Sequence, residues 1–142
     1  MSSPFASLTV SDRIPLPFDE GQWVQVRKLT GRESDQAQDA HRSAFASGRI
    51  SAWSATFRRA LEKGATDPQV MQALNDPLTG YDRFVVAKAG LVAWSYDRAI
   101  DAAAVEDLDD AAVDFIAREV LRRTKPKLFE SAEDAEAARK NG

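Results

Sequence analysis

The feature that most constrains the fold is an apolar run in the second half of the chain, from Phe84 to Trp94. Lys88 is the only charged residue in this run, which is shorter than the stretch of about 20 residues that crosses a bilayer. Because the run is apolar on nearly all sides, other elements must bury it. Its length and its three alanines favour a central helix, with a buried strand as the alternative that periodicity does not exclude.

Amphipathic patterns predict four further helices, over residues 31–47, 51–64, 67–76 and 108–125. The first begins at a capping box, in which Thr30 and Glu33 satisfy each other's backbone amides. The second carries Trp53, Phe57 and Leu61 at intervals of four residues. The last has acidic residues at its start and basic residues at its end, as the helix dipole favours.

The N-terminal part predicts a short β-hairpin. Ile14, Leu16 and Phe18 recur every second residue with prolines between them, which allows at best an edge strand. A turn at residues 19–21 leads into a second run rich in β-forming residues, 23–29. A lone hairpin is marginal in water, so this one should pack on helices or on a neighbouring subunit.

These elements predict a mainly α fold: a helical bundle of about five helices preceded by the short N-terminal β-hairpin. A chain of 142 residues can bury a sufficient core without disulfides, and this one has no cysteine. We expect a flexible N-terminus over residues 1–12 and a single α-rich domain over 13–127. Residues 128–142 should form a C-terminal tail that is at most a marginal helix.

Catalytic and metal-binding motifs are absent from the sequence. It contains no G-x-S-x-G elbow, P-loop, G-x-G-x-x-G or H-E-x-x-H pattern. His41, the single histidine, is best explained as a solvated side chain on a polar helix. The acidic residues of segment 106–110 could hold a hard cation, but they lack the ligand spacing of an EF-hand, so helix capping explains them better. We therefore expect no enzyme activity, cofactor or metal.

A protein partner is the favoured ligand. The net charge of −3 argues against a nucleic-acid binder, and the N-terminus has no signal-peptide pattern. A local basic patch around Arg122 and Arg123 is explained by favourable charge at a helix C-terminus, with phosphate binding as the alternative. Leu128 and Phe129 follow a helix-stopping proline, where an exposed apolar pair would be a docking point. Trp94 is more readily a core anchor, although tryptophan is enriched in binding hot spots. The candidate partner-binding residues are Leu128, Phe129, Trp94, Arg122 and Arg123.

Three segments carry a family resemblance: I-P-L-P followed by D-E-G-Q-W-V-Q-V-R-K-L-T-G-R-E, then L-V-A-W-S-Y, then V-E-D-L-D-D-A-A-V-D-F-I-A-R-E-V-L. Their order over residues 13–140 resembles small tail assembly chaperones and related tail-module proteins of long-tailed bacteriophages.

The resemblance implies a non-catalytic protein in the cytoplasm of the infected bacterial host. It would bind the tape measure protein, keep it soluble and assist tail tube assembly, and the hairpin edge could add self-association. The alternatives are a structural virion component, such as a connector or tail-completion subunit, and a small host-directed regulatory protein.

Overall fold

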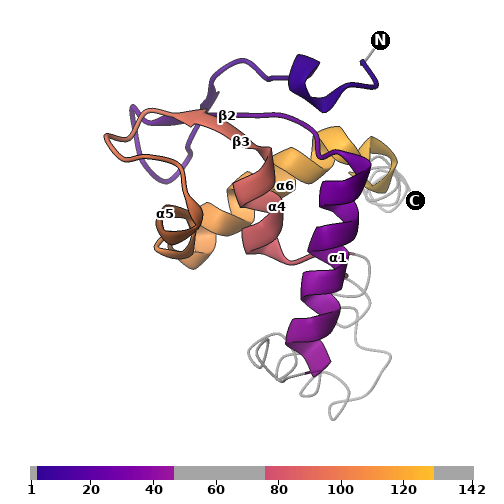
Figure 1. Cartoon of the computed structure of the whole chain (residues 1–142). Helices are drawn as coiled ribbons and strands as arrows, with labels where there is room; N and C mark the ends of the chain where they lie inside the picture. The colour runs from indigo at the N-terminus through magenta and orange to yellow at the C-terminus, as the bar shows by residue number, and fades with distance from the viewer. Residues whose placement is uncertain (1–2, 47–75, 130–142) are drawn as a thin grey trace, which may run out of the picture.

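The computed structural model describes residues 3–46 and 76–129, and this part of the chain is mainly α (Figure 1). The helices predicted over 51–64 and 67–76 lie outside it, apart from Asp76, as does most of the predicted tail. The elements in chain order are η1 (Ala6–Leu8), β1 (Ile14–Pro15), β2 (Trp23–Val26), α1 (Gly31–Ala46), α4 (Arg83–Gly90), β3 (Leu91–Trp94), α5 (Ala102–Glu106) and α6 (Asp110–Thr124).

The predicted N-terminal hairpin is present, and it belongs to a three-stranded antiparallel sheet in the order β1-β2-β3. Val24 on the central strand pairs with Ile14 on one side and with Trp94 on the other. The proline-containing strand β1 lies at an edge of the sheet, where a residue without an N–H costs no ladder hydrogen bond. Gly21 makes the turn between β1 and β2 with φ +84°, which glycine adopts without strain.

The predicted helix over Phe84–Trp94 is confirmed as far as Gly90, but its last four residues form a strand instead. Helix α4 begins after Asp82, whose carboxylate accepts from two backbone amides, and it ends at Gly90, where the chain turns directly into β3. Gly90 lies so close to α6 that a Cβ there would come within 2.4 Å of a methyl carbon of Val120. The segment reads as continuously apolar because α4 and β3 both contribute to the core, through Val86 and Leu91, and because the exposed strand residue Val92 is apolar as well.

The arrangement is not strictly a helical bundle, because the sheet forms one side of the core. Helix α4 packs against α6, α1 packs against α4, and β2 contacts α6 (Figure 1). The sheet, α4 and α6 each contribute residues with no exposed surface: Val24 and Val26 from the sheet, Val86 from α4 and Leu121 from α6. Phe129, beyond the predicted domain boundary, also belongs to this core.

The junction between β2 and α1 is fixed by the predicted capping box. The Thr30 amide donates to Glu33 Oε1 at 2.9 Å, and the Glu33 amide donates to Thr30 Oγ1 at 3.1 Å. Arg27 donates two hydrogen bonds of 2.9 Å to the same carboxylate, and they are the main reason that the pKa of Glu33 lies below its ordinary value. The Leu29 amide donates to Thr124 Oγ1 at 3.0 Å, which anchors this junction to the end of α6.

Residues 3–12 were expected to be flexible, and in the structure this segment lies beside the C-terminal end of β2. The Ser11 amide donates to the Val26 carbonyl at 2.8 Å, and the Val26 amide donates to Ser11 Oγ at 3.0 Å. Exposed apolar side chains nevertheless lie on this segment, since Phe5 is 67% and Leu8 is 72% exposed.

Candidate functional site

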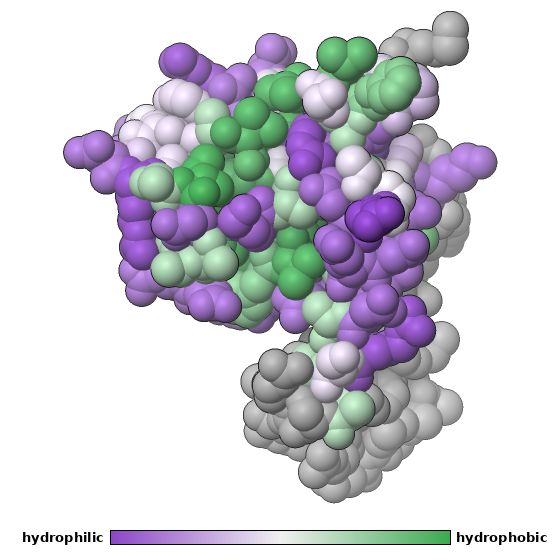
Figure 2. All heavy atoms as spheres, viewed as in Figure 1, coloured by the Kyte–Doolittle hydropathy of each residue, from purple (hydrophilic) through white to green (hydrophobic). Residues whose placement is uncertain are grey.

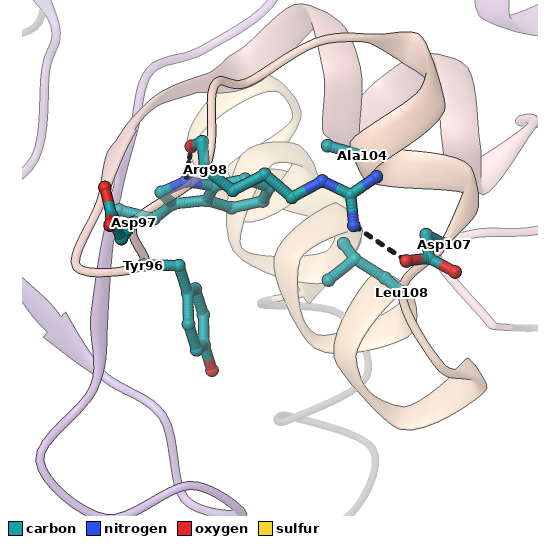
Figure 3. A pocket seen from close by; sticks show the side chains of 7 residues that line it. Tyr96, Asp97, Arg98, Ala104, Asp107 and Leu108 are labelled. Atoms are coloured by element: carbon teal, nitrogen blue, oxygen red, sulfur yellow. Dashed lines mark hydrogen bonds and ion pairs between the residues drawn. The ribbon is translucent and has the colours of Figure 1, made fainter.

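A pocket of about 340 Å³ lies where β3 ends and α5 and α6 begin (Figure 3). Its floor is apolar, and its rim carries ionic side chains. The lining residues are Trp94, Tyr96, Asp97, Arg98, Ala104, Asp107 and Leu108. Among these residues, only Trp94 was expected from the sequence to bind a partner.

Two short-range caps hold the helices that form one wall of the pocket. Asp101 accepts from the Ala104 amide at 2.8 Å and begins α5, and Asp109 accepts from the Ala112 amide at 2.8 Å and begins α6. The sequence patterns did not predict helix α5, since none of the expected helices covers Ala102–Glu106. The signal was an aspartate followed by three alanines, Ala102–Ala104, which is the pattern of an N-cap and a first helical turn.

The loop that follows β3 is closed over Trp94. The indole Nε1 of Trp94 donates to the Arg98 carbonyl at 2.7 Å, and the Tyr96 ring meets the indole edge-on with 5.7 Å between centroids. Arg98 reaches across the pocket and donates to Asp107 Oδ2 at 2.7 Å (Figure 3). The Trp94 N–H, the Arg98 guanidinium and the Asp107 carboxylate therefore already have partners in the pocket wall, and the lining is mainly apolar.

The same loop is tied to the hairpin turn. The Tyr96 hydroxyl donates to Asp19 Oδ2 at 2.6 Å, and Ser95 Oγ accepts from the Trp23 amide at 2.8 Å. Burial and then the hydrogen bond to Asp19 raise the pKa of Tyr96 to about 12. The phenol is therefore protonated at neutral pH, where it serves as a hydrogen-bond donor and not as a base.

The surroundings of the pocket are strongly acidic. Segment 96–110 contains six carboxylates and one guanidinium, Arg98, which Asp107 already pairs. All six are exposed: Asp97, Asp101, Glu106, Asp107, Asp109 and Asp110. The hairpin turn that Tyr96 contacts adds exposed Asp19 and Glu20. A positively charged ligand would therefore be attracted to this end of the molecule.

The other four predicted partner-binding residues lie at the opposite end of α6. Leu128 is 43% exposed, but Phe129 is only 8% exposed, so the expectation of an exposed apolar pair is wrong for Phe129. The guanidinium of Arg122 lies 4.6 Å from the Phe129 ring centroid and covers it. Arg123 donates to Glu119 Oε2 at 3.0 Å, so its charge is partly compensated within the helix. This end of α6 does not form one site with Trp94.

A second exposed apolar surface lies over the N-terminal segment and the sheet. Figure 2 shows apolar side chains over these elements on one face of the molecule. We use the term apolar face for the exposed large side chains of these elements, which are Phe5, Leu8 and Val10 on the N-terminal segment and Val92 on β3. Large apolar side chains that remain exposed on a folded domain are candidates for contact with another macromolecule.

Within residues 3–46 and 76–129, no group of three or more His, Asp or Glu side chains is placed to hold a metal ion. The acidic segment 106–110 instead contains the α6 cap, Asp109, and two ion-paired residues, Asp107 with Arg98 and Asp110 with Arg83. His41 lies on α1, away from the pocket lining. None of the described helices combines the length and the apolar character needed to cross a membrane.

Comparison with known proteins identifies no family. No protein-family model matches the chain, and neither a curated protein nor a solved structure matches it. The described surface and the order of segments in the sequence are therefore the grounds for a functional proposal.

Proposed function

We propose that this chain is a non-catalytic tail assembly chaperone of a long-tailed bacteriophage, which binds the tape measure protein in the host cytoplasm and assists tail tube assembly. The observation that carries the proposal is exposed apolar surface of two kinds on one small domain: the pocket beside Trp94 and the apolar face. The order of the sequence segments, which resembles that family, supplies the identity of the partner.

The geometry suits recognition of amphipathic helices. A tape measure chain exposes apolar helix surface until the tube encloses it. A protein that binds such a helix recognises a few large side chains along one of its faces. The pocket volume of about 340 Å³ is at the lower end of the range for small-molecule sites, and it suits one or two such side chains. Weak individual sites suffice, because many copies along one long partner bind with avidity.

A structural virion component is the second candidate, and β3 is the observation that favours it. In the described residues β3 pairs with β2 on one side only, and its sequence Leu-Val-Ala-Trp contains no charge and no proline. An edge without these protecting features is suited to pairing with another chain. The opposite edge strand, β1, contains Pro15 and is less suited to it. Self-association, if it uses the sheet, is therefore expected at β3.

Co-expression with a long, helix-rich neighbouring reading frame tests the leading proposal. We expect this chain to raise the soluble fraction of that partner and to be absent from purified particles by mass spectrometry. Phe5→Ser with Leu8→Ser should reduce the effect, because both side chains are exposed and contribute little to the core. Gln36→Ser, at an exposed position of α1, is the matched control and should leave the effect unchanged.

Two results would reject this proposal. If the soluble fraction of the partner does not change, the chain has no chaperone activity toward it. If the chain is present in particles at a fixed copy number, it is a connector or completion subunit. Light scattering after size exclusion, with and without partner fragments, measures whether the chain associates with itself or with the partner.

A further inference from the structure

We infer that the pocket beside Trp94 docks a large apolar side chain of a partner helix whose flanking residues are basic. This inference rests on the proposed protein-binding function and goes beyond it by naming the chemistry of the partner segment. It is carried by two independent observations, an apolar cavity of about 340 Å³ and an acidic rim around it.

The cavity requires an apolar group. The indole of Trp94 is held by its hydrogen bond to the Arg98 carbonyl, and Ala104 and Leu108 present methyl groups from the opposite wall. A hydrogen-bonding ligand would find few free partners inside, because Arg98 and Asp107 engage each other at 2.7 Å. An aliphatic or aromatic side chain needs no such partners and gains free energy from burial.

The rim selects the charge of the residues beside that group. Asp97 lines the pocket and Glu106 lies on the last turn of α5, and neither makes a hydrogen bond or ion pair within the described residues. Asp107 is exposed on the same rim, and Arg98 compensates only one of these charges. An acidic partner helix would place like charges beside these carboxylates, and a neutral one would desolvate them without supplying a counter-charge. Lysine or arginine on the partner would instead pair with them.

The test uses three alanine-rich helical peptides of about 20 residues, a length at which such helices form in water. The first carries a Phe and a Leu one turn apart, flanked by four lysines. The second has the same apolar pair flanked by four glutamates, and the third has the lysines with alanine in place of the pair. Because these changes are made in the peptide, the protein fold is the same in all three titrations.

Two signals report binding at this pocket. The indole N–H cross-peak of Trp94, assigned by its loss in Trp94→Phe, should shift on titration because that group forms the pocket wall. Anisotropy of labelled peptides gives the dissociation constant. We expect the first peptide to bind about tenfold more tightly than either of the others, and more weakly as salt rises.

Protein variants locate the charge effect. Asp97→Asn with Glu106→Gln should weaken binding of the first peptide roughly three- to tenfold at low salt. Asp35→Asn with Asp39→Asn removes the same charge from exposed positions on α1, outside the pocket lining, and should change binding by less than about twofold. Urea unfolding of both variants verifies that they are folded.

Several outcomes would overturn the inference: equal binding of the lysine and glutamate peptides, equal binding of the peptide without the apolar pair, no binding of any peptide, or an unmoved Trp94 signal. The solubilisation assay separates this failure from failure of the proposed function. If the long partner is still solubilised, the chaperone proposal stands and only the assignment of the pocket is wrong.

Discussion

Replacing Gly90 by alanine should destabilise the fold strongly, because α4 and α6 meet at this residue. A Cβ at position 90 would lie 2.4 and 2.5 Å from the two methyl carbons of Val120 and 3.0 Å from its Cβ. Val120 has no exposed surface, so its side chain cannot move into solvent. Relief therefore requires the two helices to separate or the strand after Gly90 to shift.

The expected cost follows from these distances. Overpacking a core by one methyl group typically costs about 1–3 kcal/mol, and contacts this short place Gly90→Ala near or above about 3 kcal/mol. Val120→Ala alone removes two methyl groups and leaves a cavity, at a cost of roughly 2–3 kcal/mol. The double variant should be about 1–3 kcal/mol more stable than the sum of the single effects predicts. Alanine at position 120 lacks the two methyl carbons that clash with the Cβ added at position 90, so that only the 3.0 Å contact between the two Cβ atoms is left.

Urea unfolding followed by circular dichroism measures all three variants. A loss of about 3 kcal/mol should lower the midpoint by roughly 1–3 M at an ordinary m-value. Gly31→Ala is the matched control, since an added Cβ there meets no atom within 4 Å and the backbone has no positive φ. It should be neutral or stabilising by up to about 1 kcal/mol. A Gly90→Ala variant as stable as this control, or costs that add without compensation in the double variant, would refute the proposed packing.

Three further changes test the remaining contacts. The folded parent holds the Tyr96 proton more tightly than the unfolded chain does, so the parent should lose stability as pH rises from 10 toward about 12. The Tyr96→Phe variant should not show this loss, which urea unfolding at alkaline pH measures. Burial alone would raise the pKa of Asp76, but hydrogen bonds from Arg118 and a backbone amide, together with the Arg118 charge, hold it below its ordinary value of 3.8. Asp76→Asn should therefore cost about 1 kcal/mol at neutral pH, and the difference from the parent should shrink as pH falls below that value. Gly80→Ala should cost about 1–2 kcal/mol in thermal or urea unfolding, because φ is +90° there.

Local patterns predicted the local structure well. The hairpin, the capping box of Thr30 and Glu33, and helix α6 all follow from interactions between residues close in sequence. The break at Gly90 does not, because its cause is Val120 on another helix. Periodicity fails there for a related reason: an apolar helix and an apolar strand joined end to end give one uninterrupted apolar run.

The candidate site was predictable only in part. Trp94 was identified as a large residue with a polar N–H, but its hydrogen bond to Arg98 depends on the path of the loop between them. Helix α5 was missed because it spans only Ala102–Glu106 and offers little amphipathic pattern. Phe129 was expected to be exposed because it follows Pro126. Its ring is instead covered by the guanidinium of Arg122, near the C-terminal end of α6.

The central strand of the sheet receives its two neighbours at very different times during synthesis. The β1 partner precedes β2 in the chain, but Trp23 bonds to Ser95, 72 residues later. While the ribosome makes the intervening chain, the hairpin has an apolar face without a cover, and a two-stranded hairpin is barely stable by itself. Closure of the sheet is therefore a late, non-local step that should limit the folding rate, and a nascent chain halted before β3 should be a target for proteases.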